Sequence, residues 1–232
     1  LDGGNGNDYL SIGLGNTVVS GGAGLDVLQG DFSNATSGIV MSFAVSSTSG
    51  SLVANDGTTT FTDIEQFDLT GSAFDDVLLG GNDRDTLYTG STGNDLLSGG
   101  AGLDVLYAYG SSGNSTLTGG LGDDALSAYV STGNNTLQGE DGADFLTAEW
   151  SSGNNILSGG VGDDTLTAHS STGNNYLDGG QGNDVLNAQF TSGANTLIGG
   201  GGDDILDAQG SANTSRNILD GGSGNDFLSV GL

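Results

Sequence analysis

Leucines recur along the chain at regular intervals, separated by polar segments that are rich in glycine. Between residues 99 and 206 the interval is 20 residues, and the pattern Gly-Gly-x-Gly-x-Asp-x-Leu starts at positions 99, 119, 159, 179 and 199. The copy that starts at position 139 differs only in its second glycine, which is Glu140. A fixed period of this length is typical of a solenoid, in which each repeat forms one coil.

A second pattern lies halfway between successive copies of the first. Ser-Thr-Gly-Asn-Asn-x-Leu occupies residues 131–137 and 171–177, and a close variant occupies 151–157. Each half-coil therefore supplies a glycine-rich bend and then a short strand. Because side chains alternate across a strand, we expect Leu106, Ala108 and their equivalents in other coils to face the interior. Leu97 and its equivalents should face them from the opposite sheet.

Residues 31–75 interrupt the period. Residues 39–45 predict one strand, 55–57 predict a turn, and 58–61 predict a second strand. We interpret 31–75 as a hairpin-like insertion carried on one coil, since roughly 40 residues make a poor independent core. It lies between the coils of residues 1–30 and those of residues 76–232. The prediction is one continuous all-β solenoid of about eleven coils, each of 18–20 residues.

The charge balance is strongly acidic. The chain has 29 Asp and Glu residues, two Arg, no Lys and a formal charge of −27. Nucleic acid and anionic membranes need cationic partners, and no segment approaches 18 consecutive apolar residues, so we expect neither nucleic-acid binding nor membrane insertion. With no Cys and a single His, the usual zinc cages are excluded. So much uncompensated charge predicts a bound metal cation, with order in the ion-bound state and disorder without it.

The aspartates fall into two columns, one at each bend of the coil. From Asp85 onward one column stays acidic to Asp226, and Asp8 and Asp26 follow the same pattern near the start. The other column begins with Asp76 and Asp95 and then changes to Ser115 and a series of asparagines. Stacked carboxylates cannot all stay ionised without a counter-ion, and hard oxygen ligands in a flexible loop suit Ca²⁺ better than Mg²⁺.

The repeated Gly-Gly-x-Gly-x-Asp-x-Leu-x segment resembles the nonapeptide of the RTX (repeats-in-toxin) family, whose fold is a right-handed parallel β-roll that binds calcium. The resemblance covers nearly the whole chain outside residues 31–70. It implies that aspartates and glycine-region carbonyl groups of neighbouring coils hold several Ca²⁺ ions between them. The metal-site residues that it implies are Asp8, Asp26, Asp76, Asp85, Asp95, Asp104, Asp124, Asp144, Asp164, Asp184, Asp204, Asp226, Gly99, Gly119, Gly139, Gly159, Gly179, Gly199 and Gly221.

The chain departs from that family at the second bend, where Ser/Thr-Gly-Asn-Asn replaces the acidic segment. We interpret Asn135, Asn155, Asn175 and Asn195 as an asparagine ladder whose amides bond from coil to coil. Weak calcium binding through their carbonyl oxygens is the alternative.

Two further features were weighed as sites. Paired acids such as Asp123 and Asp124 could suggest a glycosidase, but a pair that repeats in many coils forms no distinctive pocket, so we expect no enzyme in this chain. Aromatic residues near one edge are candidates for stacking on sugar rings or for contact with a neighbouring molecule, and ordinary surface aromatics are the other interpretation; they are Tyr107, Tyr109, Tyr129, Trp150 and Phe190.

The segment Leu-Ser-x-Gly-Leu occurs at residues 10–14 and again at 228–232. This suggests a window on a longer tandem chain, or a subunit that stacks end to end. The predicted function is a calcium-dependent structural protein of the bacterial cell exterior, such as a surface layer, fibre or adhesin segment. The resemblance implies secretion by a type I system. Expected partners are copies of the chain itself, with cell-surface polysaccharide as a further candidate.

Two alternatives remain open at this point. The chain could be the calcium-binding module of a secreted epimerase, protease or lipase whose catalytic domain lies elsewhere. It could also be a carbohydrate-binding rod that uses its exposed aromatic residues.

Overall fold

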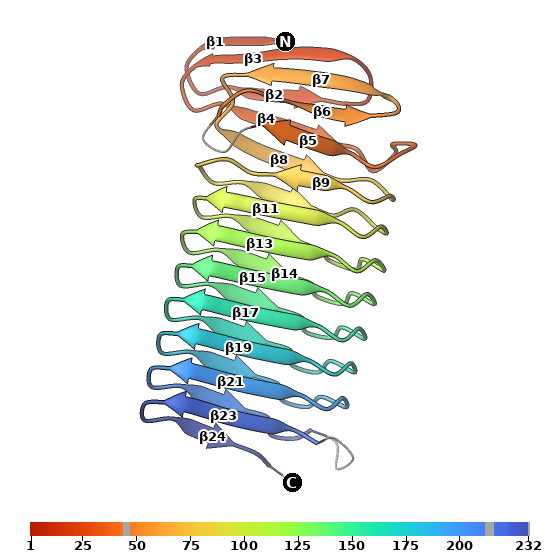
Figure 1. Ribbon diagram of the computed structural model, residues 1–232. Helices are drawn as coiled ribbons and strands as arrows, with labels where there is room; N and C mark the ends of the chain where they lie inside the picture. Colours follow the sequence, from red (N-terminus) through yellow and green to blue (C-terminus); the bar gives the residue numbers. More distant parts are fainter. Residues whose placement is uncertain (44–46, 212–215, 232) are drawn as a thin grey trace.

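The computed structural model describes residues 1–43, 47–211 and 216–231. Within these ranges the regular structure is entirely β-strand, and no helix is present that could span a membrane. The strands form two facing sheets that stack along one axis as a rod, with the N-terminus at one end and the C-terminus at the other (Figure 1). The prediction of a parallel β-solenoid with about eleven coils is confirmed, since the second sheet holds one strand from each of eleven coils.

The order of strands along the rod follows the order of the coils. The first sheet contains, in spatial order, β1 (Asp2–Asn5), β3 (Thr17–Ala23), β7 (Gly57–Thr62), β6 (Gly50–Ala54), β5 (Val40–Phe43), β9 (Val77–Leu79), β11 (Leu96–Ala101), β13 (Thr116–Leu121), β15 (Thr136–Asp141), β17 (Ile156–Val161), β19 (Tyr176–Gln181), β21 (Thr196–Gly201) and β23 (Ile218–Ser223). The second contains β2 (Tyr9–Ile12), β4 (Val27–Asp31), β8 (Gln66–Thr70), β10 (Thr86–Tyr88), β12 (Val105–Tyr107), β14 (Ala125–Ser127), β16 (Phe145–Thr147), β18 (Thr165–Thr167), β20 (Val185–Asn187), β22 (Ile205–Asp207) and β24 (Phe227–Ser229).

The core is a set of ladders in which one residue type repeats from coil to coil. Leu97 pairs in parallel register with Leu117, and Leu106 pairs with Leu126, so the side chains of one column lie directly above one another. Both leucine columns and the alanine column that begins at Ala108 are buried, as the alternation of the strands predicts. The leucine column of the first sheet is less completely covered in its last coil, where Leu219 is only partly buried.

The insertion is built into the first sheet. β5, β6 and β7 pair with one another in antiparallel fashion, while the outer strands β7 and β5 pair in parallel with β3 and β9. The predicted strand at 58–61 lies within β7. The predicted strand at 39–45 corresponds to β5, which begins one residue later, and its residues 44 and 45 lie outside the described residues. The sequence prediction missed β6.

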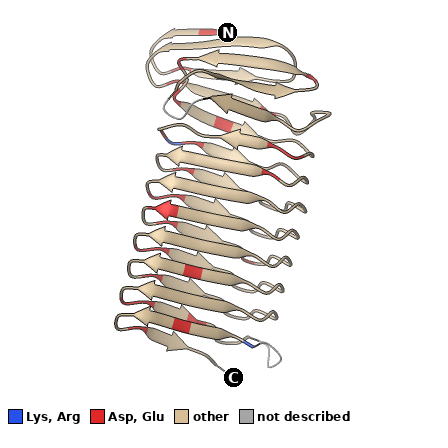
Figure 2. Ribbon diagram, in the orientation of Figure 1, with Lys and Arg blue, Asp and Glu red and all other residues tan. Residues whose placement is uncertain are grey.

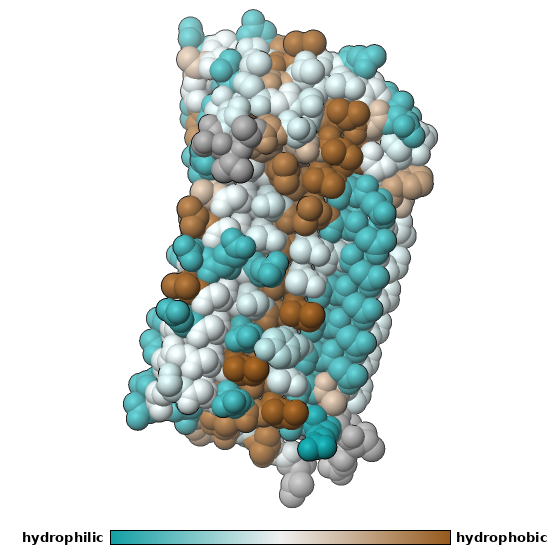
Figure 3. All heavy atoms as spheres, in the orientation of Figure 1, coloured by the Kyte–Doolittle hydropathy of each residue, from teal (hydrophilic) through white to brown (hydrophobic). Residues whose placement is uncertain are grey.

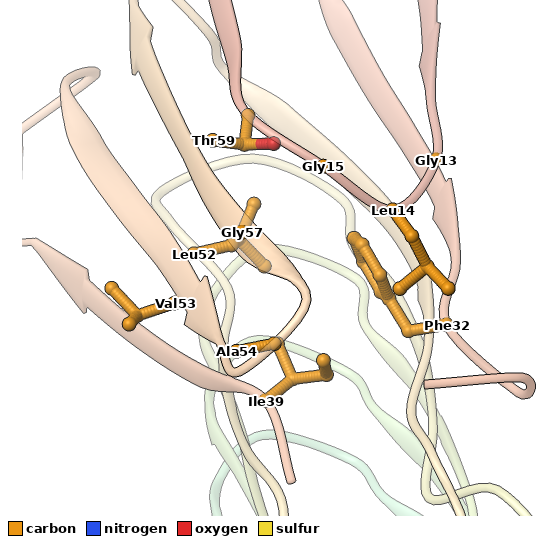
Figure 4. Close-up of a pocket in the computed structure, with 10 residues that line it drawn as sticks. All are labelled: Gly13, Leu14, Gly15, Phe32, Ile39, Leu52, Val53, Ala54, Gly57 and Thr59. Atoms are coloured by element: carbon orange, nitrogen blue, oxygen red, sulfur yellow. The ribbon is translucent and has the colours of Figure 1, made fainter. Parts of the chain in front are cut away.

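The core changes its composition beside the insertion. Phe43, Phe61 and Phe67 pack together with ring centroids 5.3–6.0 Å apart, in place of a leucine ladder. The hollow between the insertion and the first coils, lined by Phe32, Ile39 and others, is small (Figure 4). Its volume of ≈ 10 Å³ is at the lower limit for one water molecule. The insertion is therefore closely packed on the coils around it.

The leucine ladder leads to a stability prediction that can be tested with two leucines of one strand, β13. Leu117 is 0 % exposed and Leu121, on the same strand, is 58 % exposed. Leu117→Ala removes buried methyl groups and leaves a cavity, so we expect a loss of about 2–5 kcal/mol in the free energy of unfolding. Leu121→Ala is the matched control, with an expected change within about 0.5 kcal/mol. Denaturant unfolding of both variants at saturating calcium measures the difference, and equal effects would contradict the assigned core.

Candidate metal-binding edge of the rod

The bends that lead from the first sheet to the second form one edge of the rod, which we call the acidic edge. Acidic residues follow this edge from coil to coil (Figure 2, left side). Its glycines are required by the backbone, because Gly120 and Gly122 have φ angles of +121° and +115°. A Cβ atom on Gly122 would also overlap the carbonyl oxygen of Gly102 in the preceding coil. The sequence pattern thus allows the bends to stack in close contact.

One aspartate at the end of each bend joins its coil to the preceding one. The backbone N–H of Asp104 donates to Asp124 Oδ1 at 2.7 Å, and that of Asp124 donates to Asp144 Oδ1 at 2.7 Å. The same bond recurs through Asp164, Asp184, Asp204 and Asp226, and also between Asp8 and Asp26 and between Asp85 and Asp104. The predicted acidic column therefore forms a continuous line of side chains.

Sequence reasoning missed one member of this line. Between the coils of Asp26 and Asp85, Glu65 takes the place of an aspartate, and its Oε2 accepts the Asp26 N–H at 2.9 Å. The signal was present in the sequence, because Glu65-Gln66-Phe67 is a variant of Asp-x-Leu with one longer acid and one larger core residue. It was overlooked because it lies within the insertion.

The second carboxylate oxygen, Oδ2, is buried without a hydrogen-bond partner in most of these coils. Within the described part of the chain the atoms concerned are Oδ2 of Asp8, Asp26, Asp104, Asp124, Asp144, Asp164, Asp184 and Asp204. A buried carboxylate oxygen that has lost its water and gained no donor is unfavourable by several kcal/mol in order of magnitude. A row of such atoms calls for a positive partner.

The first glycine of each bend lies against this unpaired oxygen. A Cβ atom on Gly159 would overlap Asp164 Oδ2 and would lie 2.6 Å from the carbonyl oxygen of Gly179 in the next coil. The same overlap with the aspartate of the same coil occurs at the other predicted glycines, Gly99, Gly119, Gly139, Gly179, Gly199 and Gly221. The aspartate therefore leaves no room for a side chain at any of these glycines, and at Gly139, Gly159 and Gly199 a carbonyl oxygen of the next coil lies beside it.

Burial raises the pKa of these carboxyl groups, because the charged form loses its hydration. The pKa of Asp124 and of Asp164 rises to about 7, and backbone hydrogen bonds from the preceding coil offset part of this rise, while neighbouring carboxylates increase it. The pKa rises to about 6 at Asp104, Asp144 and Asp184, and it is also raised at Asp204. Near neutral pH this edge would gain stability from a bound proton or a bound cation.

The donor set fits a hard cation held between coils. Across residues 1–43, 47–211 and 216–231, no three His, Asp or Glu side chains converge into a metal-binding group. Each of these coils offers one buried carboxylate, and carbonyl oxygens of the glycine segments lie beside several of them. Such an all-oxygen set suits Ca²⁺, which accepts six to eight oxygen ligands in flexible geometry.

Three of the predicted metal residues differ from the rest because N–H or O–H groups of the protein donate hydrogen bonds to their carboxylate oxygens. Asp85 Oδ1 accepts the Phe67 N–H at 2.7 Å, and Asp85 Oδ2 accepts the Gly81 N–H at 2.6 Å. Asp76 lies on the opposite edge, where Ser72 and Ile39 donate to its two oxygens. Asp95 is next to it and accepts the Asp76 N–H at 2.9 Å. Their oxygens are therefore already partnered, unlike those of the main column.

The bends that return from the second sheet to the first form the amide edge, which carries the asparagine ladder. Asn135 N–H and Nδ2 both donate to Asn155 Oδ1, at 3.0 and 3.3 Å, and Nδ2 also donates to Ser131 Oγ and to the Gly133 carbonyl. Asn155, Asn175 and Asn195 repeat these bonds. A hydrophilic stripe follows this side of the rod (Figure 3). The predicted asparagine ladder is confirmed, and it satisfies its own polar atoms.

The paired acids have two separate environments. Asp124 is buried and points to the preceding coil, whereas Asp123 is exposed and its Oδ1 accepts the Ala143 N–H of the following coil at 2.8 Å. Asp163 does the same toward Asn183 at 2.7 Å. One acid of each pair therefore belongs to the buried column and the other to the surface, as the sequence pattern suggested.

These raised pKa values predict how the ion-free rod responds to pH. Between about pH 4, the ordinary pKa of Asp, and the raised native values of about 6 to 7, the folded rod binds more protons than the unfolded chain. Its stability therefore falls as the pH rises through this window. In excess chelator we expect more sheet signal by circular dichroism at about pH 5 than at about pH 8.

A salt control separates this effect from general charge repulsion. Salt at about 1 M screens exposed charges but does not protonate buried ones. Salt at about pH 8 should therefore restore less structure than acidification does. A sheet signal that is independent of pH in chelator would show that the buried column does not titrate as described.

Comparison with protein-family models identifies repeats on most of the chain. The model described as the RTX calcium-binding nonapeptide repeat matches residues 1–19, 11–34, 68–91, 88–109, 107–129, 127–150, 167–189, 191–214 and 209–232, which together cover well over half of the sequence. The unmatched part includes the insertion. A comparison with curated proteins found no match. With its glycine bends, acidic column and stacked coils, the chain belongs to the family of RTX calcium-binding nonapeptide repeat proteins.

Proposed function

We propose that this chain is a calcium-dependent structural rod of the bacterial cell exterior, which orders and assembles end to end when calcium is bound. The observation that carries the calcium step is the row of buried Oδ2 atoms without donors on the acidic edge. The family match supports the identity of the ion. Export from the cell is supported by the family match, because RTX repeats are typical of secreted proteins.

The residues that would hold the ions are those that converge at the bends. They are the unpaired aspartate Oδ2 atoms, together with carbonyl oxygens of the glycine segments in the same and the adjacent coil. Bound calcium would supply the positive charge that this edge lacks. The chain itself holds each carboxylate in place through the Oδ1 bond to the preceding coil, so only one oxygen of each aspartate remains available.

Calcium would act on one edge of the rod only. The amide edge completes its hydrogen bonds within the protein, so its ladder needs no ion. Coils that carry the ladder are thus joined on one side by bonds that need no ion, and on the other by bonds to aspartates whose buried charge an ion would neutralise. In a repeat array, stability depends on such nearest-neighbour interfaces, so losing the ions weakens every junction at once.

Two neighbouring aspartates test the calcium step. In Asp164→Asn an amide can still accept the Asp144 N–H, but it removes the buried charge and one calcium ligand. We expect the ion-free variant to be more stable than the ion-free wild type at about pH 7.5, while the number of tightly bound calcium ions falls by about one or two. Chemical denaturation in chelator and calorimetric titration with calcium measure the two effects.

Asp163→Asn is the matched control. It is the same substitution one residue away and makes the same change in net charge, but Asp163 is exposed and its Oδ1 bond to Asn183 can be kept by an amide. We expect it to leave both the calcium stoichiometry and the ion-free stability nearly unchanged. If the two variants behaved alike, overall charge and not the buried column would govern calcium binding.

The assembly step is supported by the two ends of the described rod. Among the described residues the outermost strands are β1 and β2 at one end and β23 and β24 at the other, so a neighbouring strand could pair at each end. Along the acidic edge each aspartate N–H donates to Oδ1 of the next coil, and Asp226 is the last in that series. In a second copy stacked on the last coil, Asp8 would provide the next Oδ1. Such head-to-tail contacts generate open filaments.

A pair of charge insertions tests assembly separately from folding. Leu228 lies on the terminal strand β24 and is 44 % exposed, whereas Val161 in the middle of the rod is 51 % exposed. Wild type and Val161→Asp should form rods of growing length at millimolar calcium, and Leu228→Asp should remain monomeric. Sedimentation velocity and negative-stain microscopy distinguish these results. Folded wild-type monomers at every concentration would overturn assembly and favour the alternative, a calcium module of a secreted enzyme.

A further inference from the structure

The outer face of the second sheet has a groove where the coils of residues 66–110 meet. Its volume is ≈ 450 Å³, within the usual range for small-molecule sites of about 300–1,000 Å³. Tyr88, Tyr107 and Tyr109 provide its aromatic lining, and Ser33, Thr70 and Ser91 provide hydroxyl groups. The groove lies where the strands of the second sheet run into the bends that return to the first sheet, on the opposite side of the rod from the unpaired Oδ2 atoms of the acidic edge, so the calcium-dependent function does not account for it.

The tyrosines form two stacked pairs that are fixed by the register of the coils. Tyr88 pairs with Tyr107 along the strands β10 and β12, and their rings stack with centroids 4.9 Å apart and an interplanar angle of 16°. Two residues further along the chain, Tyr109 stacks on Tyr129 at 5.7 Å and 10°. Rings held in this way lose little conformational freedom when a ligand binds, which favours affinity.

The groove exists because the bends after the second sheet lengthen from coil to coil. The bend between β8 and β9 spans residues 71–76, the next spans 89–95 and the third spans 108–115. Tyr109 enters with the third bend and is 62 % exposed. Gly90 and Gly110, which also line the groove, carry no side chain that could fill it. The hollow is therefore open and walled by aromatic rings on one side.

The lining chemistry suits an uncharged, hydroxyl-rich ring. The C–H face of a sugar matches the electron-rich face of an aromatic ring, and its hydroxyl groups need hydrogen-bond partners at the rim. Besides the serine and threonine hydroxyls, the Asp68 carboxylate is near: it accepts the Tyr9 hydroxyl at 3.2 Å, and its charge helps to raise the pKa of Tyr88, after burial and Tyr107. With a net charge of −27, the chain would repel an anionic polymer.

We propose that this tyrosine groove is a binding site for a neutral glycan, with the sugar rings stacked on Tyr107 and Tyr109 and their hydroxyl groups bound by the serine and threonine side chains that line it. The site is additional to the calcium-dependent role and does not depend on end-to-end assembly. It would let a calcium-ordered rod attach to an uncharged cell-surface or extracellular polysaccharide.

Direct binding of defined oligosaccharides tests the proposal. The probes are cellohexaose, maltohexaose and chitohexaose in its N-acetylated form, with hexagalacturonate as the anionic comparison. Saturation-transfer NMR and calorimetry are run on the calcium-loaded chain at up to about 10 mM sugar. At least one neutral probe should bind saturably, and hexagalacturonate should not bind.

Variants locate the binding on the protein. Tyr107→Ala and Tyr109→Ala should each weaken the neutral probe by about 3- to 10-fold, the range expected for loss of one aromatic stacking contact. Tyr109→Phe keeps the ring and should stay within about twofold of the wild type. Trp150→Ala is the control, since Trp150 is exposed in a bend but lies outside the groove. Circular dichroism with calcium checks that each variant folds.

Several results would overturn the proposal. One is no saturable binding of any neutral probe by a folded wild type. Another is equal weakening by Trp150→Ala and Tyr109→Ala, which would indicate general aromatic contact. Preferred binding of hexagalacturonate would also contradict it. If the alanine variants changed the oligomeric state and not sugar binding, the groove would be a contact between copies of the chain.

Discussion

The structure depends on whether the second terminal atom of the bend side chain, Oδ2 of Asp or Nδ2 of Asn, has a hydrogen-bond partner. On the acidic edge, Oδ1 of each buried aspartate from Asp104 to Asp204 accepts a backbone N–H of the preceding coil, and its Oδ2 lies against a glycine without a donor. The bond that stacks the coils therefore also creates a buried unpaired charge. On the amide edge, Asn155 makes the same Oδ1 bond, but its Nδ2 donates to Ser151, Gly153 and Asn175. One atom thus decides whether an edge needs a cation.

This difference explains how the rod tolerates its composition. The acids outnumber the two arginines so strongly that the coils cannot neutralise one another with side chains. Part of the acid excess is exposed to water, as at Asp123 and Asp163, where the charges stay hydrated and are screened by salt. The buried part is confined to one line, in which a cation between two coils would neutralise both. Under the proposed function, ordering of the rod would be coupled to ion binding.

Much of this could be predicted from the sequence, because a parallel stack copies each residue's surroundings from coil to coil. The leucine and alanine columns, the acidic column and the asparagine ladder all follow from the period. The sequence could not show which carboxylates the protein satisfies itself. Asp85 and Asp104 occupy equivalent positions, but only Asp85 Oδ2 has a partner, the N–H of Gly81. Nor could it show β6, whose residues Gly50–Ala54 become a strand only through pairing with β5 and β7.

The departures from the period are concentrated in one part of the rod, and they belong together physically. Where copying is strict, every coil repeats the residue pattern of its neighbour. Between residues 31 and 110 the insertion enters the first sheet, and Glu65 takes the place of an aspartate in the acidic column. The bends after the second sheet also lengthen, from residues 71–76 to residues 108–115. Each change breaks the match between adjacent coils, and the tyrosine groove lies at this mismatch. The regular coils thus carry the repeated buried carboxylates, whereas the tyrosine groove lies among the irregular coils.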